Sequence, residues 1–207
     1  MKNKIFAFSG IGFLLILSTF FILNGITCNQ AEKIAVLEKK IEILKDETTP
    51  LRFKILSKED GKISFAVKFF DSEEKPKDIN RLVQTIEGEE LSFDFIVIQV
   101  NGKHLFFPNK VYSDKIAPEN GIDLKSFYNK DGFPQIFYFK AIDQEFREIL
   151  TQIFEDIKSD NLQEDDNYFG NMVHDIANFN EYKPDRIYKI VCHTKGGIEV
   201  VEDKTTY

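Results

Sequence analysis

The chain has 207 residues, 43% hydrophobic and 29% charged, which is enough to fold around a core of its own. Its net charge of −7 is uneven: residues 1–50 hold six Lys or Arg and five Asp or Glu, which leaves 21 basic and 29 acidic residues for 51–207. An acidic domain repels phosphate backbones, so the charge argues against nucleic acid as a partner. The two cysteines, Cys28 and Cys192, exclude a disulfide framework.

The amino-terminal segment, residues 1–30, is predicted to be a membrane anchor or signal segment. Lys2 and Lys4 precede an uncharged, apolar run over 5–23. As a helix this run would measure about 28 Å, close to the ~30 Å hydrocarbon core of a bilayer. The leading positive charge predicts a cytoplasmic amino terminus and an extracytoplasmic domain, either periplasmic or at the cell surface. A cleaved signal peptide has a shorter apolar region, of about 7–15 residues, so the length favours a retained span.

Cys28 leaves open a second fate for this segment. A bacterial lipoprotein signal ends in small residues before a cysteine that becomes the lipidated amino terminus, and Gly25 to Cys28 lie in the corresponding place. Ile26 occupies a position where a small residue is expected, so an unmodified cysteine at the membrane interface is the favoured interpretation. Lipid attachment at Cys28 is the alternative. Either interpretation tethers the protein to a membrane.

Residues 31–49 are predicted to form a helical stalk. One seam has the 3-4-3 spacing of coiled-coil core positions, at Ile34, Leu37, Ile41 and Leu44. Two heptads are fewer than a firm coiled-coil prediction needs, so the seam indicates either weak homodimerisation or packing on the chain's own domain. The Thr-Thr-Pro run at 48–50 is predicted to end the stalk and mark the domain boundary.

Residues 50–207 are predicted to form an α+β domain, a mainly antiparallel sheet with helices packed on one face. Alternating apolar residues predict a hairpin over 51–69, and a Gly-Gly turn predicts another over 187–201. Helices are predicted over 76–87, over 143–158 and around 172–179, each from an apolar stripe. A short apolar run at 136–139 is predicted to be a strand.

The hairpin over 91–107 has the strongest local signal, because an Asn-Gly pair favours a two-residue turn. This turn pairs Ile98 with Leu105 and Val97 with Phe106. Apolar residues lie on both faces near the middle, which predicts central strands that are covered on both sides. Pro108 is predicted to end the pairing.

The connection over 108–133 is rich in Asn, Asp and Gly and carries Tyr112, Phe127 and Tyr128. Loops of this length are often functional, so these aromatic residues are predicted to form a binding loop. The alternative is that the same rings simply cover the sheet.

No motif identifies a reaction. Residues 72–75 have the SxxK spacing of some serine nucleophiles, but they lie in a charged loop rather than at the start of a buried helix. His104, His174 and His193 share no metal-ligand spacing. Cys192 alternates with apolar residues, as a small core residue does. No catalytic residue, cofactor or metal site is therefore predicted.

Together these features predict a membrane-tethered binding or assembly protein whose extracytoplasmic domain contacts another envelope protein. The alternative is a hydrolase-like enzyme of the cell envelope, whose active residues converge only in the folded chain.

Overall fold

The computed structural model describes the carboxyl-terminal part of the chain, within a single compact unit. The described residues are 46–75, 81–100, 103–162, 168–175, 184 and 186–204. The predicted membrane segment 1–30, Cys28 and residues 31–45 of the predicted stalk lie outside them. Among the described residues, no helix is long and apolar enough to cross a membrane.

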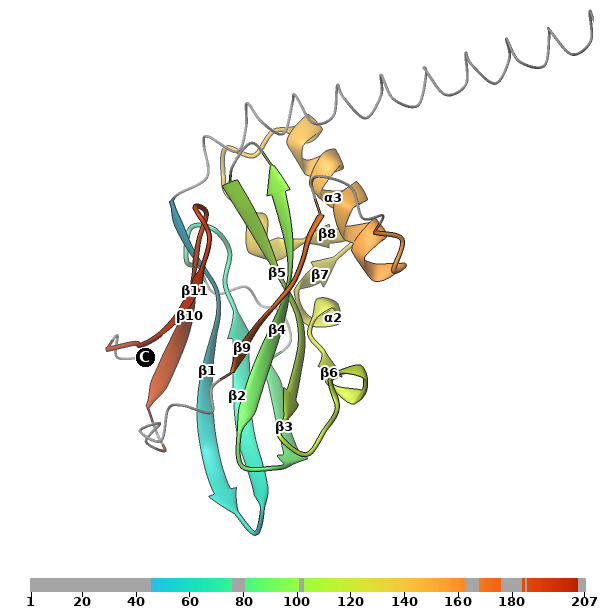
Figure 1. The fold of residues 1–207 in the computed structure, drawn as a ribbon. Helices are drawn as coiled ribbons and strands as arrows, with labels where there is room; N and C mark the ends of the chain where they lie inside the picture. The colour runs from blue at the N-terminus through green and yellow to red at the C-terminus, as the bar shows by residue number, and fades with distance from the viewer. Residues whose placement is uncertain are drawn as a thin grey trace, which may run out of the picture. The chain divides into compact units, whose positions relative to one another are not determined.

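Two antiparallel sheets contain most of the described strands (Figure 1). The five-stranded sheet has the order β11-β10-β1-β2-β3, with bounds Ile198–Glu202, Ile187–His193, Glu47–Glu59, Lys62–Phe69 and Leu82–Glu87. The four-stranded sheet has the order β6-β5-β4-β9, with bounds Ile122–Asp123, Lys103–Ser113, Leu91–Val100 and Tyr168–Asp175.

Short elements connect β5 to the one long helix that is described. In chain order after β5 these are a 3-10 turn, β6, α2, β7, β8, a second 3-10 turn and α3. Apart from β6 their bounds are Pro118–Asn120, Lys125–Tyr128, Asn129–Lys130, Phe133–Pro134, Gln135–Phe137 and Gln144–Lys158. Helix α3 begins after Asp143, whose side chain accepts a 2.9 Å hydrogen bond from the backbone N of Phe146. That bond satisfies a donor which the first turn would otherwise leave unpaired.

Aromatic side chains join the two sheets. Apolar residues of β1 alternate with basic ones, which turns Phe53 towards the interior. Its ring centroid lies 5.1 Å from that of Phe93 on β4 and 5.6 Å from that of Tyr188 on β10. All three side chains are buried. The contact between the sheets is therefore a phenylalanine-rich core. The one cysteine among the described residues, Cys192, is a free thiol.

The other face of the four-stranded sheet is also covered. Phe107 on β5 pairs with Ile96 on β4, so both side chains lie on the face opposite the five-stranded sheet. The Phe107 ring centroid lies 4.8 Å from that of Phe137 and 6.3 Å from that of Phe154 on α3. Strand β4 is consequently buried from both sides.

The structure confirms the predicted sheet-rich, mainly antiparallel domain. The hairpins over 51–69, 91–107 and 187–201 are all present, and Ile98 pairs with Leu105 as the Asn-Gly turn predicts. The helix over 143–158 is present as α3. The strands form two large sheets and a separate β7-β8 pair rather than one sheet.

Two predicted helices are strands instead. Leu82 and Ile86 lie on the inner face of β3, and residues 168–175, which include Met172 and His174, form β9 beside β4. The prediction was wrong because a spacing of four places two residues on one face of a helix and also on one face of a strand. Residues 76–80 and 176–179 of these predicted helices lie outside the described residues.

Three boundaries also differ. Pro108 does not end β5, because a β-bulge lets the strand continue to Ser113. The predicted strand at 136–139 is mostly a buried 3-10 turn, since a four-residue apolar run has no period that separates the two. Strand β1 begins at Glu47, so the last three residues assigned to the stalk pair with β10 or bulge from it.

We expect Phe53→Ala to lower the free energy of unfolding by about 3–5 kcal/mol, because the substitution leaves a cavity between the two sheets. Val83→Ala, at a side chain that is 50% exposed, is the matched control and should change it by less than about 0.5 kcal/mol. Urea titration of both variants measures the difference. Equal losses would show that the Phe53 contact does not hold the sheets together.

Candidate functional site

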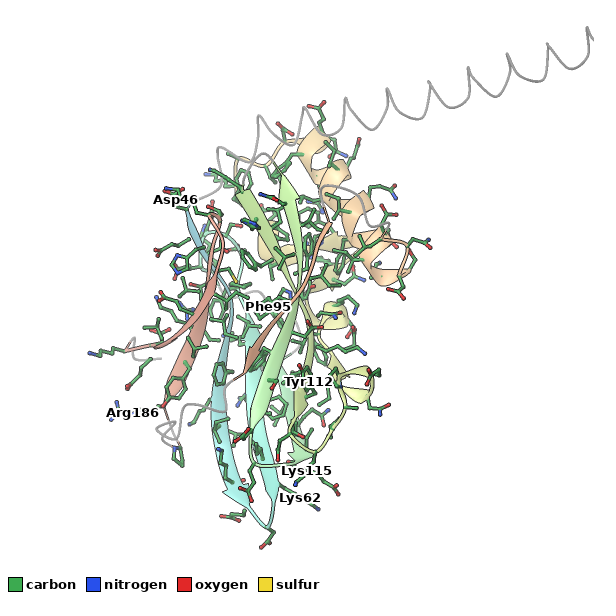
Figure 2. The ribbon with its side chains drawn as sticks, in the orientation of Figure 1. Asp46, Lys62, Phe95, Tyr112, Lys115 and Arg186 are labelled. Carbon is green, nitrogen blue, oxygen red and sulfur yellow. The ribbon has the colours of Figure 1, made fainter. Side chains whose placement is uncertain are left out.

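The candidate site begins at Asp94, a carboxylate inside the apolar strand β4. Its neighbour Phe95, labelled in Figure 2, shares a strand face with Phe93, which contacts the five-stranded sheet. Alternation along the strand therefore turns Asp94 to the opposite face, which the segment after β5 covers. Asp94 is only 5% exposed. A buried carboxylate needs partners, because an isolated charge is strongly disfavoured away from water.

A β-bulge places Asn109 beside this carboxylate. Asp94 pairs with Lys110, whereas the next residue of β4 pairs with Pro108, so Asn109 is the extra residue of β5. Pro108 suits a bulge because it has no N–H to donate to the sheet. Asn109 is buried, and its Nδ2 donates to Asp94 Oδ2 at 2.5 Å.

Lys125, the first residue of α2, is the third residue of the site, after Asp94 and Asn109. Its Nζ donates to Asn109 Oδ1 at 2.5 Å and lies 2.7 Å from Asp123 Oδ1. The Lys125 side chain is 16% exposed, and that of Asp123 is 45% exposed. Carboxylate, carboxamide and amine thus run in sequence from the interior towards the surface.

Backbone contacts hold α2 against the bulge. The N–H of Leu124 donates to the carbonyl oxygen of Asn109 at 2.9 Å. The hydroxyl of Tyr128 donates to the carbonyl oxygen of Pro108 at 2.8 Å. Burial raises the pKa of Tyr128, so its hydroxyl stays a neutral donor. Lys125 is therefore positioned by the residues on both sides of it.

The electrostatics of the site raise the pKa of Asp94. Burial raises the pKa of this carboxyl, while the Asn109 hydrogen bond and the charges of Lys125 and Lys110 act in the opposite direction. Its Oδ1 atom has no hydrogen-bond partner among the described residues. The arrangement can hold a proton at Asp94, directly beside an amide that an amine also contacts.

The predicted binding loop does not present its tyrosines. Tyr112, labelled in Figure 2, lies on β5 and is buried, and Tyr128 is fully buried. Phe127 is half-buried, with its ring centroid 6.4 Å from that of Phe69. The three rings occupy the positions expected of the alternative interpretation, in which they cover the sheets.

The other reactive side chains are held in structural roles. In the SxxK match, the Ser72 hydroxyl is buried and donates to the carbonyl oxygen of Ile136 at 3.1 Å, while Lys75 pairs with Glu73. Cys192 is fully buried, and burial raises the pKa of its thiol, so the reactive thiolate is disfavoured.

Two histidines lie near the end of the domain where β1 begins. His104 Nδ1 lies 3.2 Å from the carbonyl oxygen of Thr194. The two ring nitrogens of His193 lie 3.4 Å from Glu47 and 3.5 Å from Glu199. Within the described ranges, no three His, Cys, Asp or Glu side chains are arranged to hold a metal ion.

Asp94, Asn109 and Lys125 were not predicted as site residues. One signal was present: Asp94 is the sole charged residue in the apolar run 91–100, which was predicted to be covered on both sides. A charge in such a strand indicates a buried polar partner. Nothing local marks Asn109 or Lys125, because the bulge and the docking of α2 bring them together.

The fold and site define a class: a sheet-rich domain of two antiparallel sheets with a buried Asp-Asn-Lys row on one of them. Comparisons with models of known protein families, with curated proteins and with solved structures find no match.

The raised pKa of Asp94 predicts a pH dependence of stability. The folded protein should bind a proton at a pH where the unfolded chain, near the ordinary aspartate value of 3.8, does not. Stability relative to Asp94→Asn should therefore rise as the pH falls through the folded pKa towards 3.8, and then level off. Urea titrations of both proteins across this range measure the difference. A difference that falls with decreasing pH would contradict the assignment.

Proposed function

We propose that this protein is a membrane-tethered binding protein whose extracytoplasmic domain contacts another protein of the cell envelope. The leading lysines and the apolar run 5–23 support the tether, with Cys28 as the alternative lipid attachment point. The seam over 34–44 supports a helical stalk with weak homodimerisation. Disulfide crosslinking of cysteines introduced at position 37 or 41 would detect that dimer.

A row of cations on the five-stranded sheet carries the binding proposal. Arg52 on β1 lies directly opposite Lys189 on β10 and, on its other side, opposite Lys68 on β2. Side chains paired in this way point to the same face, so three cations lie in line across three neighbouring strands. Like charges directly opposite one another destabilise a sheet. Such a row in an acidic domain suits an acidic partner.

The surroundings of Arg52 position this row. Its guanidinium lies 4.0 Å from the ring centroid of Phe70, which is buried beneath it, and it contacts Asp203 at 2.6 Å and Glu74 at 3.1 Å. The Arg52 side chain is thereby fixed over the ring. Lys68 lies opposite Arg52 on the neighbouring strand, and its Nζ is 5.8 Å from the centroid of the Phe70 ring.

The same sheet face has complementary charges elsewhere. Lys62 lies opposite Glu59 on one side and Glu87 on the other, and His193 lies between two glutamates. Across the strands, cations of this row lie opposite cations, which departs from the pairing elsewhere on the sheet, while Asp203 and Glu74 offset part of the charge at Arg52. Charge complementarity favours one kind of occupant, an acidic surface of an envelope protein.

We expect Lys189→Glu to reduce the yield of a crosslinked complex in native membranes by about tenfold, or about 1.4 kcal/mol, because the substitution places like charges across the interface. Lys195→Glu is the matched control, since it makes the same charge change at an exposed turn of the same hairpin. The yield should also fall as ionic strength rises. Equal yields from the two variants would exclude the row as the contact surface.

The tether makes a separate prediction. Protein in the membrane fraction should resist extraction with high salt and should dissolve in detergent, because an apolar anchor is not held by charge. Mass spectrometry of the mature amino terminus then distinguishes a retained span from lipid on Cys28. Recovery of the mature protein entirely in the soluble fraction would contradict the tether.

A further inference from the structure

We propose that Lys125 and Asn109 become joined by an intramolecular amide bond, and that Asp94 is the catalytic acid and base of its formation. The reaction would be performed by the folded chain on itself. It does not depend on the binding function proposed above, because it concerns the opposite sheet and needs no partner.

The reactants are already side by side. Lys125 Nζ lies 2.5 Å from Asn109 Oδ1, so the amine is in contact with the carboxamide it would attack. The carboxamide is fixed from its other end by the 2.5 Å hydrogen bond to Asp94. Holding two reactants in this way turns an otherwise very slow aminolysis into an intramolecular step, which favours it by many orders of magnitude.

The step balances without an added reagent. The Lys125 ammonium first loses a proton to Asp123, whose Oδ1 lies 2.7 Å from Nζ, and the neutral Nζ attacks Asn109 Cγ to form a tetrahedral intermediate. The new Nζ–Cγ bond is kept and the Cγ–Nδ2 bond breaks. Protonated Asp94 donates its proton to the departing Nδ2 and takes up the second proton that Nζ gives up, and the released ammonia carries away the proton held by Asp123. One ammonium ion is released for each bond formed.

The environment of Asp94 suits its proposed role as a proton donor and acceptor. Asp94 has to donate a proton to the leaving nitrogen and then accept one, and burial moves the pKa of Asp94 upwards, in the direction that makes a protonated carboxyl accessible. Its Oδ2 accepts the hydrogen bond from Asn109 Nδ2, so the carboxyl already contacts the nitrogen that leaves. The low exposure of Asp94 and Asn109 also keeps competing water away from the carboxamide.

The bond would fasten the segment that covers β4. Residues 109 and 125 are 16 apart, and the turn Pro118–Asn120 and β6 lie between them. A covalent link between β5 and α2 closes this stretch into a loop, which restricts the unfolded chain as a disulfide does. Unlike a disulfide, an amide survives reducing conditions, so a domain without disulfides would gain a permanent crosslink.

The test is mass spectrometry of the full-length wild-type protein purified in detergent. We expect it to be lighter than its sequence by the mass of one ammonia. Digestion should yield a branched peptide that contains both Asn109 and Lys125. Lys125→Arg and Asn109→Ala should each restore the full mass. Lys115→Arg, an exposed control at the end of β5, should keep the branched peptide.

Two outcomes would overturn the proposal. The first is a wild-type digest in which the two residues occur only in separate, unmodified peptides, a result that does not depend on any variant folding. The second is loss of ammonia that persists in Lys125→Arg, because an asparagine that cyclises on its own backbone loses the same mass. Asp94→Asn should fold and lack the bond, and a linked Asp94→Asn protein would remove Asp94 from the reaction.

Discussion

The burial of β4 on both faces is the constraint on which the rest of the described domain depends. One face packs through Phe93 onto Phe53 of the five-stranded sheet. On the other face, the neighbouring Phe107 packs against Phe137 and Phe154. A strand in this position has no solvated side, so any polar side chain along it has to find its partners within the protein.

Asp94 is the one charged residue on this doubly covered strand. Because the strand cannot turn it to water, the bulge at Asn109 and the docking of α2 bring a carboxamide and an amine to it. A row of this kind can serve stability alone, since breaking a buried polar network by removing one partner is costly. In the amide exchange proposed above, the same three groups would be the reactants and the acid–base catalyst, which would give the row a chemical as well as a structural role.

The two sheets carry different polar features. The four-stranded sheet carries the buried polar row under a cover of short elements, whereas the outer face of the five-stranded sheet carries the cations of Arg52, Lys68 and Lys189. Covalent fastening on one sheet and charge-mediated contact on the other would both suit the extracytoplasmic location proposed for the domain. The two proposals rest on different residues, so either can stand without the other.

The amino-acid sequence by itself determined the mainly antiparallel fold, the three hairpins and helix α3, because turn chemistry and periodicity are local signals. It could not distinguish strands from helices where apolar residues recur every four positions, as at Leu82 and Ile86. Only the tertiary structure decided that most strands divide between two large sheets, that Tyr112 and Tyr128 are buried, and that Asp94, Asn109 and Lys125 meet. That meeting depends on a bulge and on the docking of α2, which bring together residues 15 and 16 positions apart and leave no pattern within one strand or helix.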